Sequence, residues 1–352
     1  MAFLEIKNVR IAGIAAAVPK DVKEIREQPF FEDGEAEKVI DVTHIERSRI
    51  AREGLECSDL CFEAASRLVD ELNWDINEIQ ALIYVSLSRD YPTPSTANIL
   101  QSRLNLPKEC LAFDIPFACS GYVYGLSVIS SLMQTGNIKK ALLLVGETTS
   151  RLQSSLDKTL WPLHGDGGSA TALEFNHEAE NMFFSLYSDG SRKEAIINRA
   201  GGTRRPFSES SLKLKKYGPG IARRDIDSEM DGMAVFNFAI KEPPKAVKEL
   251  CEHFKLNLED MDYFLIHQAN QYIDEKVAKK LNIPMEKMPF SLSQYGNTSS
   301  ATIPITAVAC LSDTIQDKRV NTIMLGFGSG LSWGAAWISL DKLKLLPLIE
   351  VE

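Results

Sequence analysis

The sequence predicts an α/β fold made of two similarly arranged halves. Short apolar runs alternate with helical patterns along the 352 residues, as expected for strands buried between layers of helices. An apolar fraction of 44% and a charged fraction of 25% are ordinary for a globular protein with ample core. In each half a small-residue loop introduces a helix and a Gly-rich turn leads into a final hairpin. We place the division between residues 1–180 and 181–352.

Strands are predicted where an apolar run is short and ends in turn-forming residues. Such runs predict strands at 4–18, 81–86, 111–115, 141–146, 171–175, 263–266, 322–326 and 335–340. Helical periodicity predicts helices at 58–72, 96–104, 120–133, 232–254 and 271–281, and one of about fifteen residues after 301. Ser58 is the expected N-cap of the first of these helices.

Residues 192–231 show little periodicity and are predicted to form a long loop or cap that selects the substrate. Two interpretations of its basic side chains stay open, a solvated charged loop and a contact with an anionic partner. These side chains are Arg204, Arg205, Lys213, Lys215, Lys216, Arg223 and Arg224.

Composition narrows the class of protein. A net charge of −9 argues against a nucleic-acid partner, and no apolar run has the length of a membrane span. The six cysteines are scattered and do not form a disulfide framework. Cys57 and Cys61 share one helix face, where packing is expected rather than zinc. The first residues do not resemble a signal peptide, so we predict a cytoplasmic protein.

Cys119 lies at the predicted turn between a buried strand and the helix at 120–133. The first unpaired N–H groups of a helix favour a thiolate, and the small neighbours Ala118, Ser120 and Gly121 allow close approach of a substrate. The alternative is a buried cysteine that only packs.

Two further polar residues occupy comparable places. His267 ends a buried strand, and Asn297 precedes a helix. Alone, each has a structural explanation, as a satisfied core histidine and as a helix cap. Together with Cys119 they would supply a nucleophile, an imidazole that handles protons and a neutral amide donor.

With these motifs the chain resembles β-ketoacyl-ACP synthase III, a family of the thiolase-like superfamily. Asn297 separates it from the elongating ketoacyl synthases, which have His as the third residue, and from thiolases, which use a second Cys. The matching motifs are residues 117–121 (Phe-Ala-Cys-Ser-Gly), 267–270 (His-Gln-Ala-Asn), 295–299 (Tyr-Gly-Asn-Thr-Ser) and 326–334, supported by 91–97, 165–167 and 230–236.

The resemblance implies a five-layered αβαβα thiolase-like fold, a homodimer, and decarboxylative Claisen condensation in fatty acid biosynthesis. Cys119 would take an acyl group from acyl-CoA, with the N–H groups of Cys119 and Ser329 as oxyanion hole. His267 and Asn297 would donate hydrogen bonds to the thioester carbonyl of malonyl-ACP as CO₂ leaves. Asn270 would contact the substrate. No metal, flavin or nicotinamide is implied, and the Gly-rich turns lack the dinucleotide-binding pattern.

Departures from the family pattern concern the substrates. Lys38 and Val42 stand where an aromatic residue and an arginine clamp the CoA adenine, so a carrier protein is a candidate primer donor. Lys158 replaces a phosphate-contacting arginine. Thr93 replaces a bulky Phe that the family contributes to the acyl pocket across the dimer, which predicts a longer or branched primer.

Two departures lie close to the predicted tunnel and docking surface. His164 replaces an aromatic residue and is either a second titrating group or a pocket wall. Tyr272 stands where a carrier-docking arginine is common, while Lys279 and Lys280 on the same helix could meet an acyl carrier protein.

Two alternatives remain at this point. One is a related acyltransferase, or a condensing enzyme of a specialised-metabolite pathway. The other is a non-catalytic subunit that pairs with an active partner, against which the intact Cys119, His267 and Asn297 argue.

Overall fold

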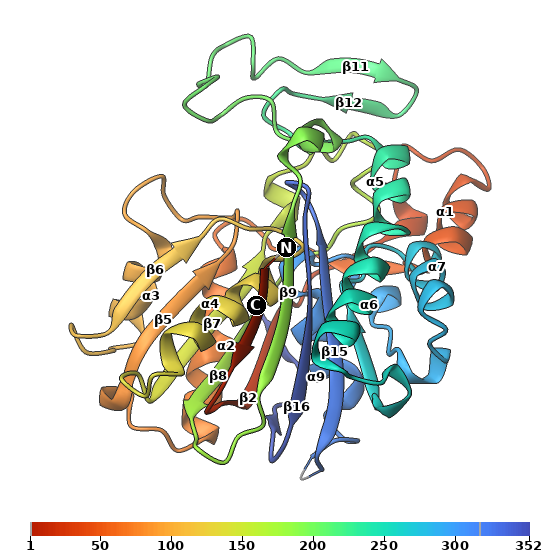
Figure 1. The fold of residues 1–352 in the computed structure, drawn as a ribbon. Helices are drawn as coiled ribbons and strands as arrows, with labels where there is room; N and C mark the ends of the chain where they lie inside the picture. The colour runs from red at the N-terminus through yellow and green to blue at the C-terminus, as the bar shows by residue number, and fades with distance from the viewer. Residues whose placement is uncertain (1, 317) are drawn as a thin grey trace.

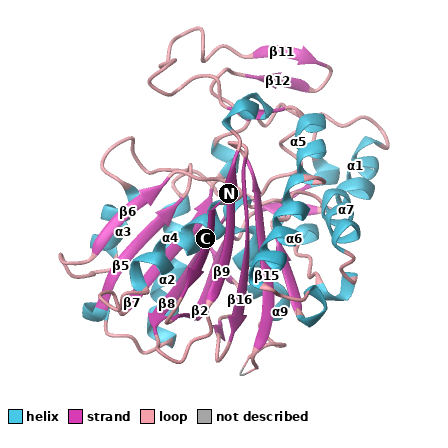
Figure 2. Cartoon of the chain, viewed as in Figure 1, coloured by secondary structure: helices cyan, strands magenta, loops and turns pink. Residues whose placement is uncertain are grey.

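The computed structural model describes residues 2–316 and 318–352, and two β-sheets run through it side by side (Figure 1). The first sheet has the order β17-β2-β8-β7-β5-β6, with β18 also paired to β2, and the second has the order β1-β9-β16-β15-β14. Helices cover the outer face of each sheet (Figure 2) and α4 and α9 pack between the sheets. This arrangement confirms the predicted thiolase-like, five-layered α/β fold.

The longest strands of the two sheets, β2, β8, β15 and β16, have 9 to 11 residues and are mostly buried. Those of the first sheet are β2 (Val9–Pro19), β5 (Ile79–Val85), β6 (Leu111–Ile115), β7 (Lys140–Glu147), β8 (Gly167–Phe175), β17 (Lys344–Leu345) and β18 (Ile349–Val351). Those of the second sheet are β1 (Ala2–Ile6), β9 (Met182–Ser188), β14 (Tyr263–Ile266), β15 (Val320–Gly328) and β16 (Ser332–Leu340). Short pairs form elsewhere, β3 (Val22–Glu24) with β4 (Arg47–Arg49) and β10 (Ile196–Ile197) with β13 (Glu229–Met230).

The helices form three layers around the sheets. The outer layer on the first sheet contains α2 (Cys57–Glu71) and α3 (Thr96–Arg103), and the central layer contains α4 (Gly121–Met133) and α9 (Thr302–Leu311). The outer layer on the second sheet contains α5 (Gly232–Ala239), α6 (Glu242–Phe254) and α7 (Gln271–Leu281). The smaller α1 (Glu35–Thr43) and α8 (Leu292–Tyr295) lie near the site described below.

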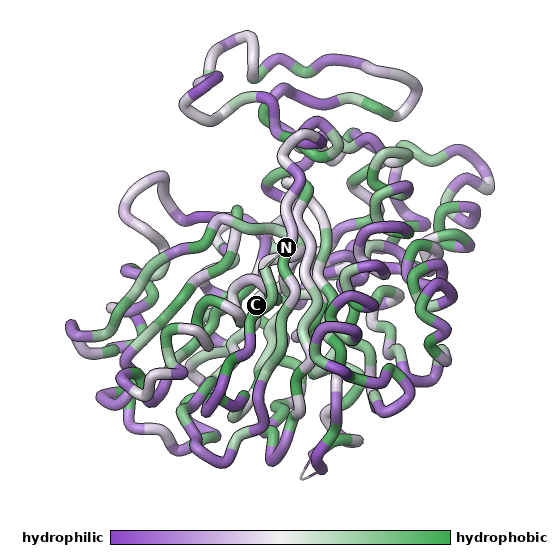
Figure 3. Tube along the Cα trace, in the orientation of Figure 1, coloured by the Kyte–Doolittle hydropathy of each residue, from purple (hydrophilic) through white to green (hydrophobic). Residues whose placement is uncertain are grey.

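Apolar side chains explain this layering. Along β2, Ile14 and Val18 pack into the central layer, whereas Ala15 and Ala17 face α2, as the alternation of side chains along a strand requires. The alternation shifts at an irregularity between Ile11 and Gly13. Figure 3 shows hydrophobic residues along the strands inside the molecule and hydrophilic residues mainly at the periphery. Both sheets are therefore buried on their two faces.

Most predicted elements are present with shifted ends, and four details of the prediction are wrong. Glu56 rather than Ser58 caps α2, because Asp59 accepts a hydrogen bond from the Glu56 N–H at 2.8 Å. The helix predicted at 232–254 is two helices, α5 and α6, and Pro243 and Pro244 lie in the first turn of the second. The helix after 301 has 10 residues. Residues 192–231 contain short strands.

Each sheet takes a strand from the opposite end of the chain. β1 pairs with β9 of the second sheet, while β17 and β18 pair with β2 of the first. β8 ends at Phe175 and β9 begins at Met182, so the proposed division after residue 180 lies in the connection between the sheets and stays a prediction.

The segment at 192–231 carries a hairpin, β11 (Lys215–Gly218) and β12 (Ile221–Arg223), that projects from the body (Figure 1). Four of its seven noted cations form ion pairs within the chain, which supports the solvated-loop interpretation for these four. The pairs are Arg205 and Lys215 with Asp225, Arg223 with Asp157, and Arg224 with Asp227.

A buried carboxyl group on α7 gives a prediction about stability. Asp274 is fully buried. Burial raises the pKa of its carboxyl group well above the usual value, and the opposing effect of the Ala269 N–H is smaller. The folded state then binds more protons than the unfolded state, so stability should fall as the pH rises above the unfolded pKa, by at most about 1.4 kcal/mol per pH unit. Asp274→Asn should flatten urea-unfolding stability between pH 5 and 8.

Glu252→Gln, on the exposed side of α6, is the control for this measurement. The same pH dependence in wild type and Asp274→Asn would contradict the assignment.

Candidate active site

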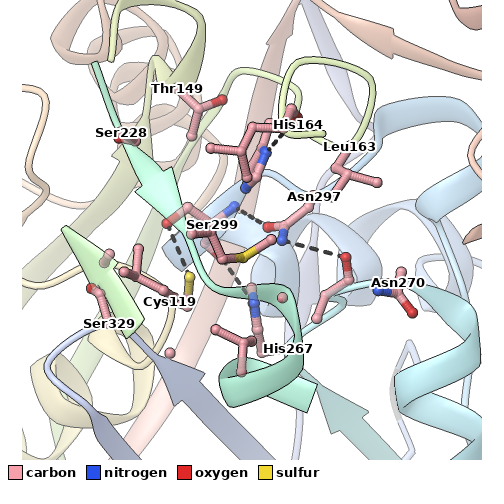
Figure 4. A pocket seen from close by; sticks show the side chains of 18 of the residues that line it. Cys119, Thr149, Leu163, His164, Ser228, His267, Asn270, Asn297, Ser299 and Ser329 are labelled. Carbon is pink, nitrogen blue, oxygen red and sulfur yellow. Dashed lines mark hydrogen bonds between the residues drawn. The ribbon is translucent and has the colours of Figure 1, made fainter. Parts of the chain in front are cut away.

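One cavity of about 530 Å³ receives side chains from both halves of the chain. Cys119, His267, Asn297 and Ser329 all line it (Figure 4), although they are far apart in sequence. The rest of its wall is largely apolar and includes Leu152, Leu160, Leu163, Ile196, Met230 and Phe236. The structure therefore brings the predicted nucleophile, imidazole and amide into one chamber of the size that holds small organic ligands.

Cys119 follows β6 and precedes α4, as predicted. Its Sγ lies 3.6 Å from Ser299 Oγ, and the backbone N–H groups of Cys119 and Ser329 lie close enough to lower the thiol pKa. Burial outweighs these contacts, however, and raises the pKa of the Cys119 thiol. The position before α4 alone therefore does not lower the pKa of Cys119: the Ser299 hydroxyl and the N–H groups of Cys119 and Ser329 limit the rise in pKa without reversing it.

The turn at Cys119 packs directly against β15 of the other half. A Cβ atom at Gly328 would lie 2.5 Å from Cys119 Cβ and 2.9 Å from its Sγ. A Cβ at Gly326 would lie 3.0 Å from Ser120 Cα. Both positions require glycine for this close contact, since a side chain at Gly328 would occupy the place of the thiol and one at Gly326 would press on the backbone of Ser120.

His267 continues the chain from the end of β14. Its Nδ1 lies 3.1 Å from the Ser299 carbonyl oxygen and 2.8 Å from Thr302 Oγ1, which leaves Nε2 as the ring nitrogen available to the cavity. Burial, with a smaller effect of His164, lowers the pKa of His267 to about 3. The imidazole is therefore uncharged at neutral pH.

Asn297 is held by backbone contacts with the loop that carries His164. The Asn297 N–H donates to the Leu163 carbonyl at 2.9 Å, and the Gly165 N–H donates to the Asn297 carbonyl at 3.1 Å. The side-chain Oδ1 accepts from the Ser299 N–H at 2.8 Å. Nδ2 donates to the Ala269 carbonyl at 3.5 Å, a long and weak hydrogen bond, and its second N–H remains available as a donor to a ligand.

Ser299 connects the three predicted residues, and sequence reasoning missed it. Its Oγ contacts Cys119, its N–H donates to Asn297 and its carbonyl faces His267 Nδ1. It achieves this with a left-handed backbone, φ 54°, which is uncommon for a serine. The Asn-Thr-Ser-Ser run at 297–300 was a visible signal of a turn, but not of these contacts.

Ser299 also gives a prediction about the thiol. Removing its hydroxyl in Ser299→Ala takes away a contact that lowers the Cys119 pKa, so the pKa should rise further. Alkylation of Cys119 by iodoacetamide at pH 8 should slow by roughly fivefold or less, the size of one ordinary hydrogen bond. Ser300→Ala is the matched control, since the Ser300 hydroxyl contacts the Gly146 carbonyl instead. Equal alkylation rates in wild type and Ser299→Ala would contradict the prediction.

Two further residues predicted to contact the substrate, His164 and Asn270, line the cavity. His164 lies beside Asn297, its Nδ1 is 3.1 Å from the Leu160 carbonyl, and burial lowers its pKa to about 4, so the ring is uncharged at neutral pH. Asn270 caps α7 by accepting from the Ile273 N–H at 2.9 Å. Glu147, which the sequence did not single out, also lines the cavity, and burial raises its pKa to about 7.

The remaining predicted substrate and docking residues lie outside the cavity of this chain. Lys158 Nζ is 3.1 Å from Glu35 on α1, so its charge is paired within the chain. Thr93 is exposed in the connection between β5 and α3, and its place in an acyl pocket across a dimer stays a prediction. Lys279 and Lys280 are exposed in the last turn of α7.

Two features bear on cofactors and membranes. In residues 2–316 and 318–352, no group of three or more His, Cys, Asp or Glu side chains is placed to hold a metal ion, and all six cysteines are free. Over the same residues, none of the helices has the length and apolar character that crossing a membrane requires.

The fold and the thiol, imidazole and amide in one chamber define the class of thiolase-like condensing enzymes. Models of the 3-oxoacyl-[acyl-carrier-protein] synthase III family match residues 113–190 and, for its C-terminal part, residues 251–340. A β-ketoacyl-[acyl-carrier-protein] synthase III of Clostridium perfringens is 34% identical over 337 residues, which cover 95% of this chain and 100% of the relative. The chain therefore belongs to the 3-oxoacyl-ACP synthase III family, acyltransferases of fatty acid biosynthesis.

Solved structures agree with this assignment. The crystal structure of a 3-oxoacyl-(acyl-carrier protein) synthase from Burkholderia xenovorans LB400 superposes with a TM-score of 0.91 and 32% identity, and 99% of each chain is covered. The priming β-ketosynthase of the R1128 polyketide pathway superposes with a TM-score of 0.81 at 21% identity over 97% of this chain and 98% of its own, which shows a shared fold.

Proposed function

We propose that Cys119, His267 and Asn297 carry out condensation of an acyl primer with malonyl-ACP. In the first step His267 Nε2 takes the thiol proton, and the Cys119 sulfur attacks the thioester carbonyl. The N–H groups of Cys119 and Ser329 stabilise the oxyanion. The donor thiolate then leaves, taking the proton from His267, and the acyl group remains on Cys119. A neutral imidazole suits this step because its Nε2 lone pair can accept the thiol proton. A base is needed because the pKa of the Cys119 thiol is raised.

In the second step the malonyl carboxylate leaves as CO₂, and the electron pair of the broken C–C bond moves to the thioester as an enolate. Asn297 Nδ2–H and an N–H on His267 Nε2 stabilise the enolate oxygen. The enolate carbon attacks the acyl group, and the Cys119 thiolate leaves and takes up one proton from the solvent, which balances the carboxylate lost as CO₂. The observation that carries this assignment is that the Cys119 sulfur, which would hold the acyl group, and the Asn297 amide, which would stabilise the enolate, line the same cavity. None of these steps calls for a cofactor.

The primer is proposed to be an acyl group of medium length. The apolar wall of the cavity favours an alkyl chain over a charged group. Val42 lines the cavity at a position where the family resemblance places an adenine-clamping arginine, and Lys158 is paired with Glu35; both observations support a donor other than CoA. Both acyl-CoA and an acyl carrier protein are therefore proposed as donors, with the carrier favoured.

Homodimerisation is supported by β6, an edge strand of the first sheet, whose unpaired backbone groups could pair with the same strand of a second copy. Its apolar residue Leu111 is 44% exposed in the single chain. A carrier protein with an acidic surface would find Lys279 and Lys280 exposed on α7, the helix whose Asn270 and Tyr272 line the cavity. The free thiols of all six cysteines suit a reducing compartment such as the cytoplasm.

The test is the intact mass of the protein after incubation with acyl-CoAs and acyl-ACPs from two to twelve carbons. A medium-chain adduct on Cys119, followed by CO₂ release and a β-ketoacyl product on addition of malonyl-ACP, is expected. An adduct that transfers to an alcohol or amine without CO₂ release would identify an acyltransferase instead. No adduct from either donor series would overturn the proposed function.

A further inference from the structure

Three buried oxygen and nitrogen atoms beside the cavity form a closed triangle. Thr302 Oγ1 lies 2.8 Å from His267 Nδ1 and 3.0 Å from the Ser299 carbonyl oxygen, which itself lies 3.1 Å from Nδ1. The three residues are at most 4% exposed, so water does not replace these contacts. A carbonyl oxygen can only accept a hydrogen bond, whereas a hydroxyl group can donate or accept. Of the two oxygens in the triangle, only the Thr302 hydroxyl can therefore change between donating and accepting a hydrogen bond.

The triangle accommodates either neutral form of the imidazole. When the ring proton is on Nδ1, it is donated to the two oxygens, and Nε2 presents a lone pair to the cavity. When the ring proton is on Nε2, the Thr302 O–H can turn and donate to Nδ1. Without that hydroxyl, the lone pair of Nδ1 would face only the Ser299 carbonyl, and a buried acceptor would be left unpaired.

The proposed reaction uses both forms. Taking the thiol proton requires a lone pair on Nε2, and stabilising the enolate requires an N–H on the same atom. A doubly protonated ring would also supply the N–H, but burial and the neighbouring His164 oppose its positive charge. In the malonyl step a neutral ring must therefore hold its single proton on Nε2. During acylation the ring instead starts with that proton on Nδ1 and carries a second proton only until the leaving donor thiolate takes it.

We propose that Thr302 is a positioning residue that makes the Nε2–H form of His267 accessible for the malonyl step. This inference rests on the proposed function and assigns a role to a residue that does not line the cavity. The alternative is structural, since a hydroxyl in the first turn of α9 that donates to Ser299 would also help to start the helix.

Two variants separate these roles. Thr302→Val has the shape of threonine without the hydroxyl, and Thr302→Ser keeps the hydroxyl. Acylation of Cys119 is followed by intact mass with whichever acyl donor labels the wild type. Decarboxylation is followed as CO₂ released from malonyl-ACP by the Cys119→Ala protein with and without each Thr302 substitution.

Thr302→Val should slow decarboxylation roughly tenfold or more, the effect of one unpaired buried group, while acylation changes by less than about twofold. Thr302→Ser should restore decarboxylation. In ¹⁵N spectra of the imidazoles, Thr302→Val should shift His267 toward the Nδ1–H form. Thermal unfolding reports whether each variant folds.

Equal losses in both half-reactions, or no loss in either, would overturn the inference, as would an unchanged tautomer signal in Thr302→Val. These outcomes are distinct from failure of the proposed function, in which the wild-type protein neither acquires an acyl group nor releases CO₂.

Discussion

Replacing Cys119 with alanine is expected to abolish the acyl adduct completely while malonyl decarboxylation remains measurable. The sulfur is the atom that forms the thioester, and no other thiol lines the cavity among the described residues. His267 and Asn297 stay in place, so the enolate-stabilising donors are retained. Intact mass measures the first half-reaction, and CO₂ release from malonyl-ACP measures the second.

The complementary variant is Asn297→Asp. The aspartate keeps an oxygen that can accept from the Ser299 N–H, as Asn297 Oδ1 does at 2.8 Å, but it lacks the Nδ2–H donor and adds a negative charge beside a developing enolate. Decarboxylation should fall by roughly 100-fold or more while the acyl adduct still forms. If Cys119→Ala still forms an adduct, or if Asn297→Asp leaves decarboxylation intact, the assigned roles are wrong.

A second large effect is expected from Gly328→Ala, a change of one methyl group outside the three assigned residues. The new Cβ would lie 2.5 Å from Cys119 Cβ and 2.9 Å from Sγ, well inside contact distance. Either the thiol or β15 must move, and a displacement of about 1 Å costs a reaction on the order of 100-fold. Acylation should therefore fall by at least that factor.

Gly190→Ala is the matched control, because a Cβ there meets nothing within 4 Å and its acylation rate should equal that of wild type. Thermal unfolding of both variants separates misplacement of the thiol from loss of the fold. Normal acylation in a folded Gly328→Ala protein would contradict the contact between β15 and the nucleophile turn.

Much of this site could be predicted because it lies where regular elements begin and end. Cys119 precedes α4, His267 follows β14 and Asn297 precedes the turn to α9, and each position shows in the sequence as an apolar run that stops at small or polar residues. The segment at 192–231 was harder to predict. Its hairpin has no repeating apolar pattern, and four of its cations are matched by Asp157, Asp225 and Asp227.

The substrate residues illustrate a different limit. Lys158 was predicted to replace a phosphate-contacting arginine of the family, yet it pairs with Glu35, which is 123 residues away in sequence. Thr93 was inferred to reach an acyl pocket through a second subunit, so a single chain contains only part of that site. A sequence shows the type of residue at such positions, whereas its partners depend on segments brought together by folding.

By itself, the sequence predicted the α/β class from local periodicity and the family from motifs at element ends, and both predictions are confirmed. The same motifs pointed to the three residues to which we assign the chemistry. Only the tertiary structure decided the protonation of the Cys119 thiol and the His267 ring. Burial leaves Cys119 as a thiol with a raised pKa and His267 as a neutral ring, against the expectation of a thiolate drawn from the helix start alone. The left-handed turn at Ser299 and the Thr302 hydroxyl appear only in space. The physical reason is that desolvation and hydrogen bonding depend on every neighbour of an atom, and most of those neighbours are distant in the chain.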